Sequence, residues 1–166
     1  MFDPNQYVNA EVTGALATEA ILIPEGDFIG TIIPVEARNF REVNTNDGPR
    51  AVCDITFEFS DEKIQEVTKR SRNTCRYTIW LDTTDSGGLS MEKGLNIGLG
   101  RLREAVKQNW EDKPWSFNML GGRPALCAIK HSLSKGVMYA NVTDVAPVGS
   151  TPKAAVAAEA SKSKRK

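Results

Sequence analysis

The sequence predicts a mainly β protein that carries one helix. Two stretches, 50–59 and 74–82, alternate strictly between apolar and polar side chains, which is typical of half-buried strands. Between 90 and 106 the apolar residues recur at helical spacing instead, and after them two more strand-like runs flank a short glycine-containing turn. These three observations set the fold class.

The first strand is predicted from Phe28 to Val35, after a turn signal that contains Pro24. Gly30 indicates a bend or bulge inside it, and Pro34 indicates an edge or a second bulge. A sheet that curls into a small barrel needs such breaks. Residues 1–23 are weakly patterned and are either an N-terminal arm or an edge strand, and 36–49 is predicted as a loop.

The second and third strands carry their apolar side chains on one face. The segment between them, 61–73, is polar and is either a loop or a ragged extension of a hairpin. The apolar positions are Ala51, Cys53, Ile55, Phe57 and Phe59 in the second strand, and Cys75, Tyr77, Ile79 and Leu81 in the third.

A helix is predicted to begin near Ser90, a suitable N-cap. Glycines within it weaken a helix by up to ~1 kcal/mol each relative to alanine, so close packing on the sheet is the simplest compensation. Its apolar stripe is Leu95, Leu99, Leu102 and Val106, and its glycines are Gly94, Gly98 and Gly100.

The last two strands are predicted from Pro124 to Ser132 and from Val137 to Val145, joined as a hairpin. A hairpin alone is marginal in water, so it must lie against the other elements. The order of three strands, a helix and two strands suggests a five-stranded antiparallel OB-fold-like barrel, with the helix between strands three and four. The alternative is an open α+β sheet with the helix on one face.

Composition indicates one domain, residues 1–148, followed by a disordered basic tail, 149–166. The 166 residues have a formal net charge of zero, but the tail carries +4, so the body carries −4. There is no apolar run near the ~18 residues of a membrane span, and no secretory signal is visible, so we expect a cytoplasmic protein.

The three cysteines, Cys53, Cys75 and Cys127, fit no zinc pattern, and each falls on the apolar side of a different strand. We therefore expect buried free thiols, no metal and no cofactor. Catalysis is not expected either. His131 is the only histidine, and no GxSxG, HExxH, P-loop or Cys-x-x-Cys motif is present.

Four stretches carry a resemblance: IPEGDF before the first strand, the helix after the third, LGGRPALCAIKH, and YANVTDVAP. Together, over residues 2–147, they resemble a family of small phage-encoded OB-like proteins that bind single-stranded DNA or accompany recombination. The resemblance implies largely sequence-independent binding of single-stranded DNA in phage replication or recombination, in the host cytoplasm. A homo-oligomer and other phage replication or recombination proteins are open alternatives as partners. The chain ends in SKSKRK rather than in an acidic tip, so recruitment of partners by such a tip is not expected.

The best candidate for base stacking is Trp80, on the polar face of the third strand with Arg76. Single-strand binders combine a basic track with exposed aromatic side chains. Two acids oppose this interpretation, because Asp54 and Glu58 lie on the same face of the second strand and would neutralise Arg76. Trp80 would otherwise pack under the N-terminal arm or the long loop.

Further candidates lie in predicted loops. Phe40 stands between two cations after the first strand, and otherwise caps the end of the barrel. A basic run before the third strand is either a phosphate site or a solvated face, and Lys135 lies in the last hairpin turn. The full set is Arg38, Phe40, Arg41, Lys69, Arg70, Arg72 and Lys135. A protein-interaction or structural module with the same fold and no nucleic-acid role is the rival function.

Overall fold

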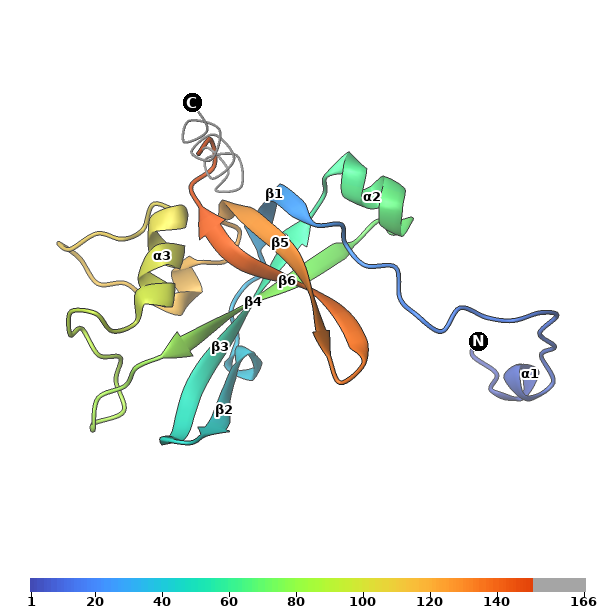
Figure 1. Ribbon diagram of the computed structural model, residues 1–166, viewed down its shortest axis with the longest axis horizontal. Coiled ribbons are helices and arrows are strands. Elements are labelled where there is room, and N and C mark those ends of the chain that lie inside the picture. The colour runs from blue at the N-terminus through green and yellow to red at the C-terminus, as the bar shows by residue number, and fades with distance from the viewer. Residues whose placement is uncertain (151–166) are drawn as a thin grey trace, which may run out of the picture.

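The computed structural model describes residues 1–150, and the sheet dominates it (Figure 1). Of the predicted tail, all but Gly149 and Ser150 lies outside the described residues. The strands are β1 (Gly26–Ile32), β2 (Phe40–Thr45), β3 (Gly48–Phe59), β4 (Asn73–Leu81), β5 (Pro124–Ser134) and β6 (Val137–Ala146). The helices are α1 (Asn5–Val8), α2 (Glu62–Thr68) and α3 (Ile97–Ala105), with 3-10 turns η1 (Ala37–Asn39) and η2 (Phe117–Met119).

The mainly β class is confirmed, and the sheet closes partly into a ring. Its order is β1-β5-β6-β4-β3-β2, and β1 also pairs with β3. The sheet is mixed rather than antiparallel throughout, because β4 and β6 run parallel where Arg76 is in register with Asn141. The other pairings are antiparallel. In Figure 1, α2 and α3 lie at opposite ends of the sheet.

The interior is built from the apolar positions that alternation predicted. Ile55 and Phe57 of β3 are fully buried, and Ile129 of β5 is only 1% exposed. All three cysteines are free and buried. Burial, with a smaller contribution from the charge of Asp54, raises the pKa of the Cys53 thiol to about 12, so this thiol stays protonated at neutral pH.

The prediction of a loop over 36–49 was wrong, because residues 40–45 form β2. This strand pairs with β3 from Phe40↔Cys53 to Thr45↔Gly48. The turn between them is closed by a hydrogen bond of 2.6 Å from the hydroxyl of Thr45 to the carbonyl of Gly48. Because β2 lies at the edge of the sheet and is mostly exposed, it needs no apolar alternation. Residues 1–150 therefore contain six strands, not five.

The helix begins at Ile97, not near Ser90, and the reason is a long-range contact. Asn96 adopts a left-handed backbone with φ 51°. Its side-chain oxygen accepts from the Asp82 backbone N–H at 2.8 Å, and its amide nitrogen donates to the carbonyls of Asp82 and Ser90. These bonds hold residues 90–95 as a loop, and they leave Leu95 outside the helix and 40% exposed.

The rest of the predicted stripe is confirmed, since Leu99, Leu102 and Val106 are buried. Close packing is needed at Gly98, where a Cβ atom would meet Ile79 Cγ2 at 3.2 Å.

The segment 61–73 also differs from the prediction of a loop or a hairpin extension, because it contains α2. Asp61 caps this helix by accepting from the Lys63 N–H at 2.9 Å. Residues 1–21 form no strand and are all exposed, so they are an arm.

Candidate nucleic-acid interface

A polar row crosses four strands on the outer face of the sheet. Thr56 of β3 is in register with Arg76 of β4, Arg76 with Asn141 of β6, and Asn141 with Lys130 of β5. Registered neighbours point to the same face of a sheet, so these four side chains lie side by side. The inner face of the same strands forms the apolar core, which fixes the direction of every member of the row.

Beside this row lies a cleft of about 560 Å³, open to solvent. Three arginines line it: Arg38 after β1, Arg72 before β4, and Arg76 within β4. The fold therefore brings together cations that lie up to 38 positions apart in the sequence. The remaining lining residues are Ile33, Pro34, Asn39, Asp54, Thr56 and Thr74.

Asp54 is the acid at the centre of the cleft, and it binds its neighbours tightly. Arg41 Nε lies 2.7 Å and Arg76 Nη1 3.5 Å from Asp54 Oδ2, and the Thr78 hydroxyl donates to Oδ1 at 2.7 Å. Partial burial alone would raise the pKa of Asp54. The hydrogen bonds from Arg41 and Thr78, with the charges of Arg41 and Arg76, outweigh it and hold the pKa below its ordinary value. Asp54 is therefore ionised at neutral pH.

The other two arginines make exposed ion pairs. Arg72 Nε lies 2.9 Å from Glu58 Oε2, and Arg38 Nε lies 2.6 Å from Glu36 Oε2. The side chains of Arg38 and Arg72 remain 80% and 68% exposed. Exposed pairs of this kind contribute about 0–1 kcal/mol, so both guanidinium groups are available to another anion at little cost.

Trp80 lies farther along β4 on the same outer face, and 43% of it is exposed. Neither the arm nor the long loop therefore covers this residue completely. The Arg50 guanidinium sits 5.0 Å from the ring centroid, and Arg50 also bonds Asp82 at 3.0 Å. Val52, in register with Trp80 and with Arg41, is fully buried on this outer side. Arg50 thus holds one face of the indole.

The remaining predicted residues do not line the cleft. Phe40 is opposite Cys53, which puts it on the core side, and its ring packs edge-on against Phe117 at 5.0 Å. Arg70 donates to the Ile21 carbonyl at 2.8 Å and thereby anchors the arm. Lys69 ends α2 and Lys135 lies in the β5–β6 turn, both with left-handed backbones.

Sequence reasoning missed three residues of this surface: Arg50, Asn141 and Tyr139. Tyr139 lies two residues before Asn141 on the same face, in register with Ser132, and is 49% exposed. The alternation of β3 was enough to place Arg50 on the outer side. Nothing in the sequence gives the register of the parallel β4–β6 pair, on which the positions of Asn141 and Tyr139 depend.

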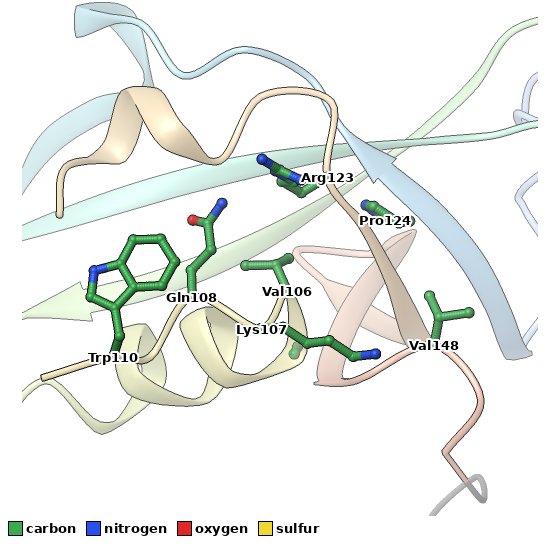
Figure 2. Close-up of a pocket in the computed structure, with 8 residues that line it drawn as sticks. Val106, Lys107, Gln108, Trp110, Arg123, Pro124 and Val148 are labelled. Atoms are coloured by element: carbon green, nitrogen blue, oxygen red, sulfur yellow. The ribbon is translucent and has the colours of Figure 1, made fainter. Parts of the chain in front are cut away.

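A second cavity, of about 330 Å³, lies between the end of α3 and the start of β5. Figure 2 shows its walls, with Trp110 and Val148 on opposite sides and Gln108 and Val106 between them. It is mainly apolar, and it shares no lining residue with the cleft or with the polar row. Its other lining residues are Ala105, Lys107, Arg123 and Pro124.

Comparison with known proteins assigns the chain to no family. No protein-family model matches the chain, and no curated protein matches it. Within residues 1–150, no helix is long and apolar enough to cross a membrane. Over the same residues, no group of three or more histidine, cysteine, aspartate and glutamate side chains could hold a metal ion.

If the cleft binds phosphate, Asp54→Asn is expected to strengthen that binding several-fold. The asparagine keeps an oxygen for the Thr78 hydroxyl but removes the charge that Arg41 and Arg76 now neutralise. The salt dependence is expected to steepen by up to about 0.7 in the slope of log affinity against log salt. Anisotropy of labelled oligo-dT, titrated at two salt concentrations, measures both changes. Weaker binding by a folded Asp54→Asn protein would contradict the placement of phosphate here.

Proposed function

We propose that the protein is a non-catalytic single-stranded DNA-binding protein that binds largely without regard to sequence. The observation that carries the proposal is the cleft lined by Arg38, Arg72 and Arg76, with the exposed Trp80 four residues along β4 from Arg76 on the same face. A basic groove next to aromatic rings suits a flexible single strand, because phosphates meet cations while bases stack. A role in phage replication or recombination, in the host cytoplasm, rests on the family resemblance alone.

We further propose that the ring is an OB-fold-like barrel. Its support is the pairing pattern of the five strands other than β2. β1 pairs with β3 and β5, β3 with β4, and β5 with β6, while β4 meets β6 in parallel; α3 falls between β4 and β5. In OB-folds, oligonucleotides bind the face of the second and third strands and the adjoining loops. Here that face corresponds to the outer side of β3 and β4.

The charges of the cleft predict modest affinity. Arg38, Arg41, Arg72 and Arg76 face Glu36, Asp54 and Glu58, which leaves one excess positive charge. A phosphate must therefore displace existing partners. For Arg38 and Arg72 this costs little, since their pairs are exposed, whereas Asp54 stays bonded to Arg41 and Thr78. Binding should consequently be sensitive to salt.

Stacking supplies the second contribution. Trp80 presents one exposed face, and Arg50 holds its position through the cation–π contact and the bond to Asp82. Tyr139 offers a second exposed ring, on the part of the outer face near Arg76. A DNA strand that passes from Trp80 over Arg76 toward Tyr139 would run along β4 and cross the polar row at Arg76.

The stacking contribution is tested by Trp80→Ala. Because each stacked base contributes on the order of 1–3 kcal/mol, we expect oligo-dT affinity to fall by roughly one to two decades. Fluorescence anisotropy of labelled oligo-dT gives the dissociation constant. The matched control is Tyr7→Ala, which removes an exposed aromatic ring (59%) from the arm and should leave affinity unchanged. Equal affinities for the wild type and Trp80→Ala would remove Trp80 from the interface.

The competing function is a protein-interaction module without a nucleic-acid role. The paired acids in the cleft favour it, because they already satisfy the arginines. The two functions differ in one observable. A nucleic-acid site binds oligo-dT that is long enough to cover the row, and this binding depends on salt. An interaction module binds no oligo-dT, even at low salt.

A further inference from the structure

The free end of the β5–β6 hairpin projects beyond the ring, and residues 130–141 are called the hairpin tip here. β1 pairs with β5 only as far as Ile129, and β6 meets β4 only at Asn141. Among the described strands, the residues of the tip other than Asn141 therefore pair only with each other. Leu133 and Met138 are in register across the tip and are 68% and 47% exposed. Open strand edges with apolar side chains are ready surfaces for another chain.

The two faces of the tip differ. Lys130 and Ser132 are in register with Asn141 and Tyr139, and this face continues the polar row. Leu133 and Met138 belong to the other face, which continues from the core side through Ile129. The apolar patch of the tip, Leu133 with Met138, is thus separate from the surface assigned to nucleic acid.

The N-terminal arm, residues 1–21, has apolar side chains that pack on no core. Every residue of it is exposed, and it runs away from the sheet to α1 at its far end (Figure 1). Its root is held beside the hairpin tip, because the Ile23 carbonyl lies 2.7 Å from a ring nitrogen of His131. Between its two ends, the large apolar side chains of the arm are Phe2, Tyr7, Val8, Val12 and Leu16, from 59% to 81% exposed.

The charges of the arm and the tip are complementary. The arm contains Asp3, Glu11 and Glu19 and no lysine, arginine or histidine. The tip contains two lysines, Lys130 on the face of the polar row and Lys135 in the turn, and no aspartate or glutamate. Opposite charges around apolar surfaces favour the right partner and speed its encounter.

We propose that the arm of one copy docks on the Leu133–Met138 patch of a second copy. The arm leaves its own body at Ile21, which Arg70 holds, and runs outward (Figure 1), and the Leu133–Met138 patch beside its root stays exposed. Two copies placed tip to tip bring each arm root next to the other copy's tip. The exchange is then reciprocal, and a reciprocal contact closes as a two-fold dimer. This dimer does not depend on the proposed function, since it uses the opposite face of the tip.

Sedimentation velocity of the full chain over a range of concentrations tests the proposal. We expect the wild type to form a dimer. Leu133→Glu, in the tip, and the pair Val12→Glu with Leu16→Glu, in the arm, should each raise the dimer dissociation constant at least tenfold. The matched control is Val67→Glu, which adds the same charge at a 46% exposed valine of α2 and should leave the dimer unchanged.

The arm pair guards against a folding artefact, because its side chains pack on no core and their replacement should leave the circular dichroism spectrum intact. A wild type that stays monomeric at its highest soluble concentration overturns the proposal, including the case in which the arm folds back on its own tip. A dimer that survives both the tip variant and the arm variant overturns it as well. Oligo-dT affinity measured on the same variants reports separately on the nucleic-acid site.

Discussion

Replacing Arg38, Arg72 and Arg76 together by alanine is expected to weaken oligo-dT binding by on the order of 100-fold. These three arginines line one cleft, and each side chain is more than half exposed. A hydrogen bond of this kind contributes about 1 kcal/mol net, so three lost contacts amount to roughly two decades of affinity. The slope of log affinity against log salt should also flatten by about 2, or 0.7 for each phosphate contact with a single strand.

The matched control for this variant removes the same formal charge elsewhere. Lys63, Lys93 and Arg101 are exposed cations outside the cleft. Their replacement by alanine should change affinity by less than threefold if the cleft, and not the net charge, governs binding. Anisotropy titrations of both triple variants at several salt concentrations give affinities and slopes together. Equal losses in the two variants would mean that attraction is diffuse and that the cleft has no special role.

Leu102→Ala is expected to lower the free energy of unfolding by roughly 2–5 kcal/mol, the usual cost of a cavity left by a buried leucine. Leu102 is fully buried in α3, and this helix packs on β4 and β6. The midpoint of urea denaturation measures the change. Leu95→Ala serves as the control, because Leu95 lies before the helix and is 40% exposed. Equal midpoints for the two variants would contradict the burial of Leu102 between α3 and the sheet.

Elements whose burial alternates with period two were predictable from the sequence. β4 buries one parity, β3 does so apart from Val52, and β4 pairs with β3 over its whole length, from Ala51↔Leu81 to Phe59↔Asn73. In such strands the hydrophobic pattern and the tertiary burial agree, so local reasoning succeeds. The β5–β6 hairpin was also anticipated, because its turn and both its strands are local in sequence.

The failures have a different physical origin. β2 is an edge strand whose polar side chains face water, so its only signal is the pairing with β3, which the sequence does not display. The start of α3 is decided by Asn96, whose side chain bonds to Asp82 fourteen residues earlier. Contacts with residues elsewhere in the chain determine both β2 and the start of α3. The hydrophobic periodicity of a segment carries no information about such contacts.

The candidate site divides in the same way. Arg76 and Trp80 were placed on the outer face by alternation alone. Arg38 and Arg72 join Arg76 only because the closing of the ring brings three segments to one cleft. Phe40 was assigned to the site from its flanking cations, but its backbone pairing with Cys53 turns the ring toward Phe117 and the core side.

The central claim, that the outer face of β3 and β4 binds single strands, is tested most directly by titrating labelled oligo-dT with the wild-type protein. The titration should begin at low ionic strength, because the acids in the cleft limit affinity. We expect saturable binding that weakens as salt is added. A duplex of the same length should bind with lower affinity. A long oligo-dT that shows no binding even at low ionic strength would contradict the claim and favour the protein-interaction module.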